Sequence, residues 1–208
     1  MTRDLDWNVL AKGSPLLAAM PEYVRRNAQL CRFPKSAHVF ARGDRPQVMY
    51  FIISGEVHLV RSSLTGDQIV LQRVQRGFLA EASLDQARYH CDAVAARASE
   101  LLVLPRKPFR EALADEQFSK AWMSHLSDEL RRARTQVERL ALKSAEARIL
   151  HYVETEGRDG VVILNQSKKD WANELGLTHE ALYRALARME RGGRIRSDET
   201  GLTLLPMT

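Results

Sequence analysis

Three kinds of hydrophobic pattern follow one another along the chain. Residues 33–104 hold short β-type apolar runs separated by turn residues, which is typical of an antiparallel barrel or double sheet. Residues 109–143 contain neither glycine nor proline, and their apolar residues recur at helical spacing. The remaining residues predict short helices and a final hairpin. The pattern therefore predicts an α+β chain, with a jelly-roll-like antiparallel β-roll in residues 1–108, a long helix in 109–143 and a separate domain in 144–208.

Turn residues divide the predicted β-roll into strands. Glycine tolerates the positive φ angles of tight turns, and it recurs between the apolar runs. The apolar runs are HVF, VMYFII, VHLV, QIVLQRV, DAVAA and ELLVL. The expected turns are Gly43-Asp44, Ser54-Gly55, Thr65-Gly66-Asp67 and Gly77.

The long helical stretch carries one narrow apolar seam. From Leu126 to Leu140 its apolar residues recur at spacings of four, three, four and three, which matches the a and d positions of a coiled coil. The seam could pack on the β-roll of the same chain, but a narrow seam on a long helix favours a second helix and predicts a parallel homodimer. The charged residues expected on the other side are Asp128, Glu129, Arg131, Arg132, Glu138 and Arg139. The expected dimer interface is Trp122, Leu126, Leu130, Ala133, Val137 and Leu140.

Residues 164–196 have the pattern of two short helices joined by a tight turn. Ser167 can cap the first helix and Thr178 the second, because each can accept a hydrogen bond from a free backbone N–H group. Gly176 lies between the helices and tolerates the conformation that the turn needs. Apolar and polar residues then alternate around Glu199-Thr200-Gly201, which predicts a hairpin. Residues 144–208 are therefore expected to form a winged helix-turn-helix.

The second of these helices has a polar face suited to reading DNA. Arginine can bond guanine O6 and N7, and glutamate can accept from cytosine N4, each good contact giving roughly 1–3 kcal/mol of discrimination. Glu180 and Arg184 share this face; the alternative is a surface ion pair worth about 0.2–0.5 kcal/mol. The two caps, the glycine turn and the hairpin favour DNA contact. The predicted DNA-binding residues are Glu180 and Arg184 on bases, with Lys168, Thr178, His179 and Arg188 as phosphate or auxiliary contacts.

Two segments resemble one protein family. GLTHEALYRALARMERGG resembles the DNA-reading motif of the Crp/Fnr family of bacterial transcription regulators, in which a glutamate and an arginine four residues later read a G·C-containing half-site. Glu180 and Arg184 occupy those positions, and His179 stands where some members carry a further base-reading arginine. Residues 40–57 resemble the β-roll of cyclic-nucleotide-binding domains.

The resemblance implies a homodimer that binds double-stranded DNA. Such a dimer reads an inverted repeat whose half-site centres lie roughly 34 Å apart. A change in the β-roll would shift the helix pair and re-aim the two reading helices. RNA polymerase is an expected partner if the protein is an activator.

The ligand pocket of cyclic-nucleotide-binding members is only partly matched. There a Gly-Glu pair precedes a short helix and an Arg-Ser or Arg-Thr pair follows it, so that the carboxylate meets the ribose and the guanidinium meets the phosphate. Here Glu81 stands in the glutamate position, Ala80 replaces the glycine, and His90-Cys91 falls where Arg-Ser would be. Residues 133–135 also lack the Thr-Ser pair that meets adenine in cyclic AMP receptors. Cyclic AMP is therefore not the expected effector. The candidate pocket residues are Glu81, His90, Cys91 and Arg134.

His90 and Cys91 leave several interpretations open. Imidazole and thiolate bind haem iron and other transition metals, and a reactive thiol could sense redox state. Adjacent residues on a strand point to opposite faces, however, so both could not easily bind one metal. The simplest interpretation is that Cys91 is a small buried side chain and His90 a residue of the rim. A haem, metal or thiol-redox sensor is thus the alternative function; the effector could also be another small ligand, or absent.

The amino-acid composition excludes several further classes of protein. The 208 residues include only two cysteines, too few for a disulfide framework or a thiolate-held cluster. The net charge of +5 does not come from the predicted DNA-binding domain, because residues 143–208 hold ten basic and ten acidic residues. The N-terminal residues lack the pattern of a signal peptide, and the chain lacks an apolar run of about 18 residues, so a cytoplasmic protein without a membrane partner is expected. Catalytic spacings and a metal-ligand motif are not visible, so an enzyme is not expected.

Overall fold

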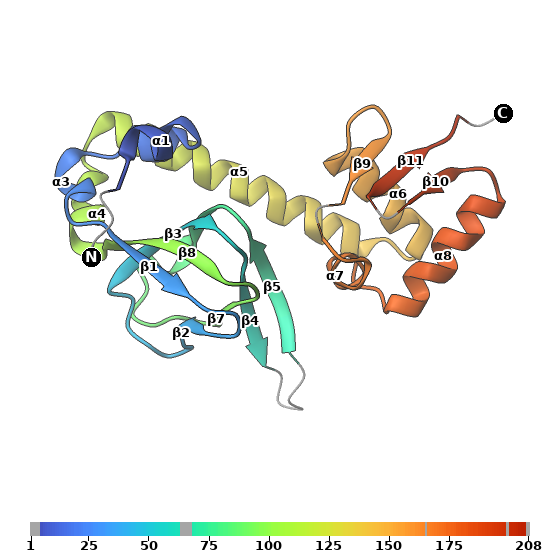
Figure 1. The fold of residues 1–208 in the computed structure, drawn as a ribbon, viewed down its shortest axis with the longest axis horizontal. Coiled ribbons are helices and arrows are strands. Elements are labelled where there is room, and N and C mark those ends of the chain that lie inside the picture. The colour runs from blue at the N-terminus through green and yellow to red at the C-terminus, as the bar shows by residue number, and fades with distance from the viewer. Residues whose placement is uncertain (1–4, 63–67, 165, 199, 207–208) are drawn as a thin grey trace. The chain divides into compact units, whose positions relative to one another are not determined.

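The chain folds into two compact units in a computed structural model, which describes residues 5–62, 68–164, 166–198 and 200–206 (Figure 1). The first unit spans Met1–Ser127 and the second Asp128–Thr208. The turn predicted at Thr65-Gly66-Asp67, and Glu199 of the predicted hairpin, lie outside the described residues. Among the residues that are described, no helix combines the length and the apolar character needed to cross a bilayer.

Two antiparallel sheets form the body of the first unit. Their strand orders are β1-β8-β3-β6 and β2-β7-β4-β5. The strands of the first sheet are β1 (Gln29–Phe33), β8 (Ser99–Pro105), β3 (Val48–Ser54) and β6 (Gly77–Leu79). The strands of the second are β2 (His38–Phe40), β7 (Asp92–Ala95), β4 (Val57–Ser62) and β5 (Gln68–Val74). The predicted antiparallel β-roll is confirmed, since each apolar run contributes a strand.

The β1-β8-β3-β6 sheet has a different core on each face. Because side chains alternate along a strand, Phe51 and Leu102 pack into one apolar cluster, whereas Ile52 and Leu101 pack into another. The second cluster also takes side chains from the other sheet. The first is covered by helices from both ends of the unit, namely α1 (Trp7–Lys12), α2 (Pro15–Ala18), α3 (Glu22–Arg25), α4 (Arg106–Ala112) and the start of α5 (Glu116–Ala141).

The long helical stretch predicted after the β-roll is divided in two. Helix α4 ends before Leu113, and Asp115 then caps α5 by accepting a hydrogen bond from the backbone N–H of Phe118 at 2.8 Å. An aspartate that satisfies a free N–H group starts a new helix without a glycine or proline. This explains why the apolar period alone did not show the break.

Trp122 does not belong to the exposed seam of α5 in which the sequence analysis placed it. It is 4% exposed, and its ring lies 5.5 Å from that of Phe78 and 5.1 Å from that of Phe109 in edge-on contacts. The neighbouring Met123 is 60% exposed and continues the heptad spacing back from Leu126, which is only partly buried. The exposed apolar face of α5 consists of Met123, Leu130, Ala133, Val137 and Leu140.

The second unit is built around the predicted helix pair. Its elements after α5 are α6 (Ala145–Glu156), β9 (Val161–Ile163), α7 (Lys168–Glu174), α8 (His179–Arg191), β10 (Ile195–Ser197) and β11 (Gly201–Leu204). Strands β10 and β11 pair in antiparallel fashion, as the predicted hairpin requires. Strand β9 adds a third strand beside β11, which was not predicted although its β-branched run is typical of a strand.

Substitution of Trp122 by alanine is expected to destabilise the first unit. Removal of a buried tryptophan side chain leaves a cavity and costs about 3–5 kcal/mol of unfolding free energy. Val9→Ala is the control, because Val9 is 61% exposed on α1 of the same unit, and its effect should stay within about 0.5 kcal/mol. Urea unfolding of both variants measures the difference; similar stabilities would show that Trp122 is not part of this core.

Candidate nucleic-acid interface and sensor pocket

Both caps and the turn of the helix-turn-helix have the predicted geometry. The Ser167 hydroxyl accepts from the Asp170 N–H at 3.1 Å, and the Thr178 hydroxyl accepts from the Ala181 N–H at the same distance. Gly176 has a φ of +63°, which favours glycine at this position. These contacts fix where α8 begins and therefore which of its side chains lie on the surface.

Helix α8 buries one face and exposes the predicted DNA-reading face. Its buried residues are Leu182, Ala185, Leu186 and Met189. Glu180 and Arg184 are exposed, and no ion pair joins them among the residues that the structure describes. The surface ion pair considered as the alternative is therefore not formed. The rings of His179 and Tyr183 lie 4.6 Å apart on the exposed side. Tyr183 is an exposed aromatic residue that the predicted site did not include.

Two of the predicted phosphate contacts are engaged inside the domain. The ammonium nitrogen of Lys168 is buried 5.4 Å from the Trp171 ring, without a hydrogen-bond partner among the described residues. Burial there lowers the pKa of Lys168 below its ordinary value. Arg188 makes an ion pair with Glu146, which also holds Arg194 at 3.0 Å. Both basic groups therefore have contacts inside the domain, whereas the side chains of Glu180 and Arg184 are exposed.

Arg148 is a structural arginine that the sequence analysis missed. Its guanidinium donates to the carbonyls of Leu140 and Leu142 at 3.0 and 2.9 Å, at the end of α5. It also donates to those of Leu175 and Gly176 at 3.0 and 2.9 Å, in the helix-turn-helix turn. One side chain of α6 therefore ties the end of α5 to the turn before α8. An arginine on an amphipathic helix has no sequence signal that distinguishes this role from solvent exposure.

Arg139 also differs from its expected position on the charged side of α5. It is 1% exposed, and its guanidinium lies 4.7 Å from the centre of the Tyr152 ring. It donates to Thr155 and Glu156 at 2.9 and 2.8 Å. The partners come from α6, so the burial of Arg139 depends on tertiary contacts that the helical period does not show.

Glu81 lies in a constrained part of the first unit. It starts the 3₁₀ turn η1 (Glu81–Ser83), and its carboxylate is 2.8 Å from Nε2 of His125 on α5. The preceding Ala80 has a φ of +61°, a left-handed conformation that costs a non-glycine residue roughly 1–2 kcal/mol. Alanine therefore adopts the backbone that the glycine of the related motif would favour.

The other candidate pocket residues have different surroundings. Cys91 is fully buried in the core between the two sheets, where burial raises the pKa of its thiol. His90 is exposed, and Arg134 is exposed on the part of α5 that belongs to the second unit. The described residues contain no cluster of three or more His, Cys, Asp or Glu side chains that could hold a metal ion. A raised thiol pKa disfavours the reactive thiolate, so Cys91 has the character of a packed apolar side chain.

Aromatic side chains occupy the space between the sheets. The rings of Phe40 and Tyr89 stack at 3.7 Å, and those of Phe40 and Tyr50 lie 5.8 Å apart. The hydroxyl of Tyr50 donates to the carbonyl of Val39 at 3.3 Å, and burial raises the pKa of Tyr89. The interior near Cys91 is thus largely apolar, unlike a site for a charged phosphate.

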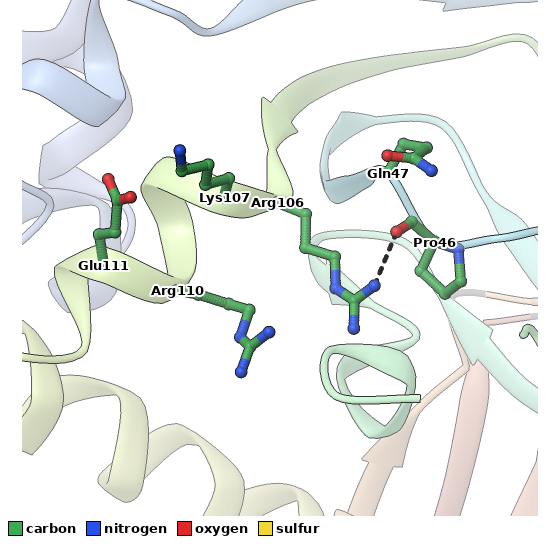
Figure 2. Close-up of a pocket in the computed structure, with 6 residues that line it drawn as sticks. All are labelled: Pro46, Gln47, Arg106, Lys107, Arg110 and Glu111. Carbon is green, nitrogen blue, oxygen red and sulfur yellow. Dashed lines mark hydrogen bonds between the residues drawn. The ribbon is translucent and has the colours of Figure 1, made fainter. Parts of the chain in front are cut away.

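An open hollow of about 510 Å³ lies at the start of α4, and its lining does not include the predicted pocket residues (Figure 2). Arg106 donates to the Pro46 carbonyl there at 3.0 Å, and it also donates to the carbonyl of Leu84 at 2.6 Å. Arg110 makes an ion pair with Asp85 at 3.0 Å. The arginines that line the hollow therefore hold neighbouring loops together. The lining residues are Pro46, Gln47, Arg106, Lys107, Arg110 and Glu111.

Comparisons with known proteins agree with this architecture. Residues 30–116 match the cyclic nucleotide-binding domain. A cyclic AMP receptor protein of Thermus thermophilus is 28% identical over 193 residues, which cover 89% of each chain.

Solved structures of the same fold lie at lower identity. FixK2 of Bradyrhizobium japonicum has a TM-score of 0.65 and 20% identity, covering 86% of this chain and 93% of its own. TTHA1359, a transcriptional regulator of the Crp/Fnr family from Thermus thermophilus, has a TM-score of 0.61 and 24% identity, covering 86% and 94%. Residues 30–116 are therefore similar to a cyclic nucleotide-binding domain, and the predicted resemblance of the chain to the Crp/Fnr family of transcription regulators is confirmed.

Proposed function

We propose that the protein is a homodimeric, sequence-specific DNA-binding transcription regulator that acts in the cytoplasm. The observation that carries this proposal is that Glu180 and Arg184 are exposed on α8 and form no ion pair within the part of the chain that the structure describes. An arginine that is not held by a neighbouring carboxylate can give both N–H donors to a guanine, and the free glutamate can accept from a cytosine. Its relatives are regulators rather than enzymes, and this supports the same function.

The exposed apolar face of α5 supplies the dimer contact in this proposal. Val137 is 69% exposed and Leu130 52% exposed, although both are apolar residues at heptad positions. Burial of each such side chain against a second helix is favourable by roughly 1.5–3 kcal/mol. Two copies related by a two-fold axis would present two α8 helices to an inverted repeat with a G·C pair in each half-site.

The dimer is proposed to respond to an effector other than cyclic AMP, or to bind DNA without any effector. In the β-roll, the exposed His90 and the buried Cys91 stand where the related motif has an arginine that would neutralise a cyclic phosphate. Without that charge, binding would leave the phosphate desolvated and unpaired. If the protein activates transcription, RNA polymerase is the expected partner.

Arg184→Ala should remove the preference for one G·C pair in each half-site. The expected loss of discrimination is about 1–3 kcal/mol at that pair, with little change at other positions. Arg191→Ala is the matched control, because Arg191 is an exposed arginine at the far end of the same helix. Binding to duplexes that carry every base at each position measures both variants. An equal loss on all sequences would refute the base-reading role of Arg184.

Val137→Glu should convert the dimer to a monomer, because two charges would face each other in an apolar seam. Val9→Glu is the control, since Val9 is 61% exposed but lies on α1. Sedimentation equilibrium gives the mass of each variant. A Val137→Glu protein that keeps the mass of the wild type would place the dimer contact elsewhere.

Cyclic AMP should leave DNA affinity unchanged to within about twofold, because each missing hydrogen bond to its charged phosphate removes roughly 1.5–3 kcal/mol of binding. Fluorescence anisotropy with and without the nucleotide tests this expectation, with cyclic GMP as a parallel sample. A tenfold gain in affinity with cyclic AMP would show that another residue supplies the missing charge.

A further inference from the structure

Glu81 and His125 join the β-roll to α5 through a partly buried polar contact. Nε2 of His125 lies 2.8 Å from Oε1 of Glu81, and the two side chains are 21% and 9% exposed. A carboxylate is an acceptor, so the imidazole N–H donates. Both residues belong to the first compact unit.

Aromatic rings surround this hydrogen bond. The ring of His125 lies 5.4 Å from that of Trp122 and 5.8 Å from that of Phe78. Phe78 and Trp122 are themselves buried in the core that α5 covers. A hydrogen bond in such a setting is electrostatically stronger than in water, and a buried carboxylate without its partner is unfavourable.

The arginines near η1 are occupied by other groups. Arg106 donates to the backbone carbonyls of Leu84 and Gln86 at 2.6 and 3.2 Å, and Arg110 is paired with Asp85. His125 is thus the partner that α5 supplies to Glu81. Ala80, held in the left-handed region directly before Glu81, sets the backbone that directs this residue into the turn.

We infer that the Glu81–His125 hydrogen bond is an internal clamp that holds η1 against α5 in the place of a bound ligand. The resemblance to cyclic-nucleotide-binding members puts Glu81 where a glutamate would meet the ribose, whereas here the protein's own histidine holds the carboxylate. The clamp holds the first half of α5 against η1. Its link to DNA binding rests on the function proposed above.

The clamp is tested first by hydrogen exchange in the DNA-free protein. His125→Leu removes the donor at similar volume, and backbone amides of residues 80–84 should then exchange about tenfold faster. His125→Gln keeps a donor and should stay close to wild type. Lys120→Gln is the control, because it breaks the exposed Lys120–Glu116 ion pair on the same helix. If circular dichroism shows that His125→Leu is unfolded, Glu81→Ala provides the same test from the other partner.

Affinity for the DNA site selected by the wild type is the second readout. His125→Leu should bind that site about tenfold more weakly, and His125→Gln should bind it normally. Unchanged exchange in His125→Leu would overturn the clamp, and faster exchange with unchanged affinity would overturn its link to DNA binding. If the wild type selects no site, the proposed function fails, while the exchange measurement still decides whether the hydrogen bond holds η1.

Discussion

The position of α8, the proposed DNA-reading helix, depends on the hydrogen bonds of one guanidinium. Arg148 donates to carbonyls at the end of α5 and in the turn before α8. A planar group with five donors in a fixed geometry can join two backbone segments in a way that a lysine cannot. Arg139 adds a second buried tie between α5 and α6. Any signal that moves α5 would therefore be transmitted to the helix-turn-helix through polar contacts of defined direction.

The charged residues of the second unit divide into those that hold the domain and those left for a partner. Glu146 engages Arg188 and Arg194, while Lys168 packs on Trp171. Glu180 and Arg184 remain exposed without such partners among the described residues. Pairing of Arg188 and Arg194 with Glu146 reduces the positive charge available for unselective attraction to phosphate, which is the sequence-independent part of DNA binding. What is left on α8 is a pair of side chains suited to base edges.

Local signals in the sequence were sufficient to predict the strands, the two caps, the Gly176 turn and the hairpin, because each of these features depends on residues that are close in the chain. The helical period located the seam of α5 but could not decide between Trp122 and Met123, which are adjacent and face directions about 100° apart. Phe78 and Phe109 decide the matter, and they come from distant segments. The burial of Arg139 and Lys168 and the pairing of Glu81 with His125 were missed for the same reason. Each depends on a partner that only the folded chain brings close.

Selection of bound sequences from a random DNA pool, with protein purified without added effector, tests the central claim most directly. A regulator with two exposed reading helices should select an inverted repeat that has a G·C pair in each arm and half-site centres roughly 34 Å apart. Binding that is salt-sensitive but selects no sequence would contradict a regulator that is competent as isolated. It would mean that the α8 helices are not aligned with two half-sites without a further signal.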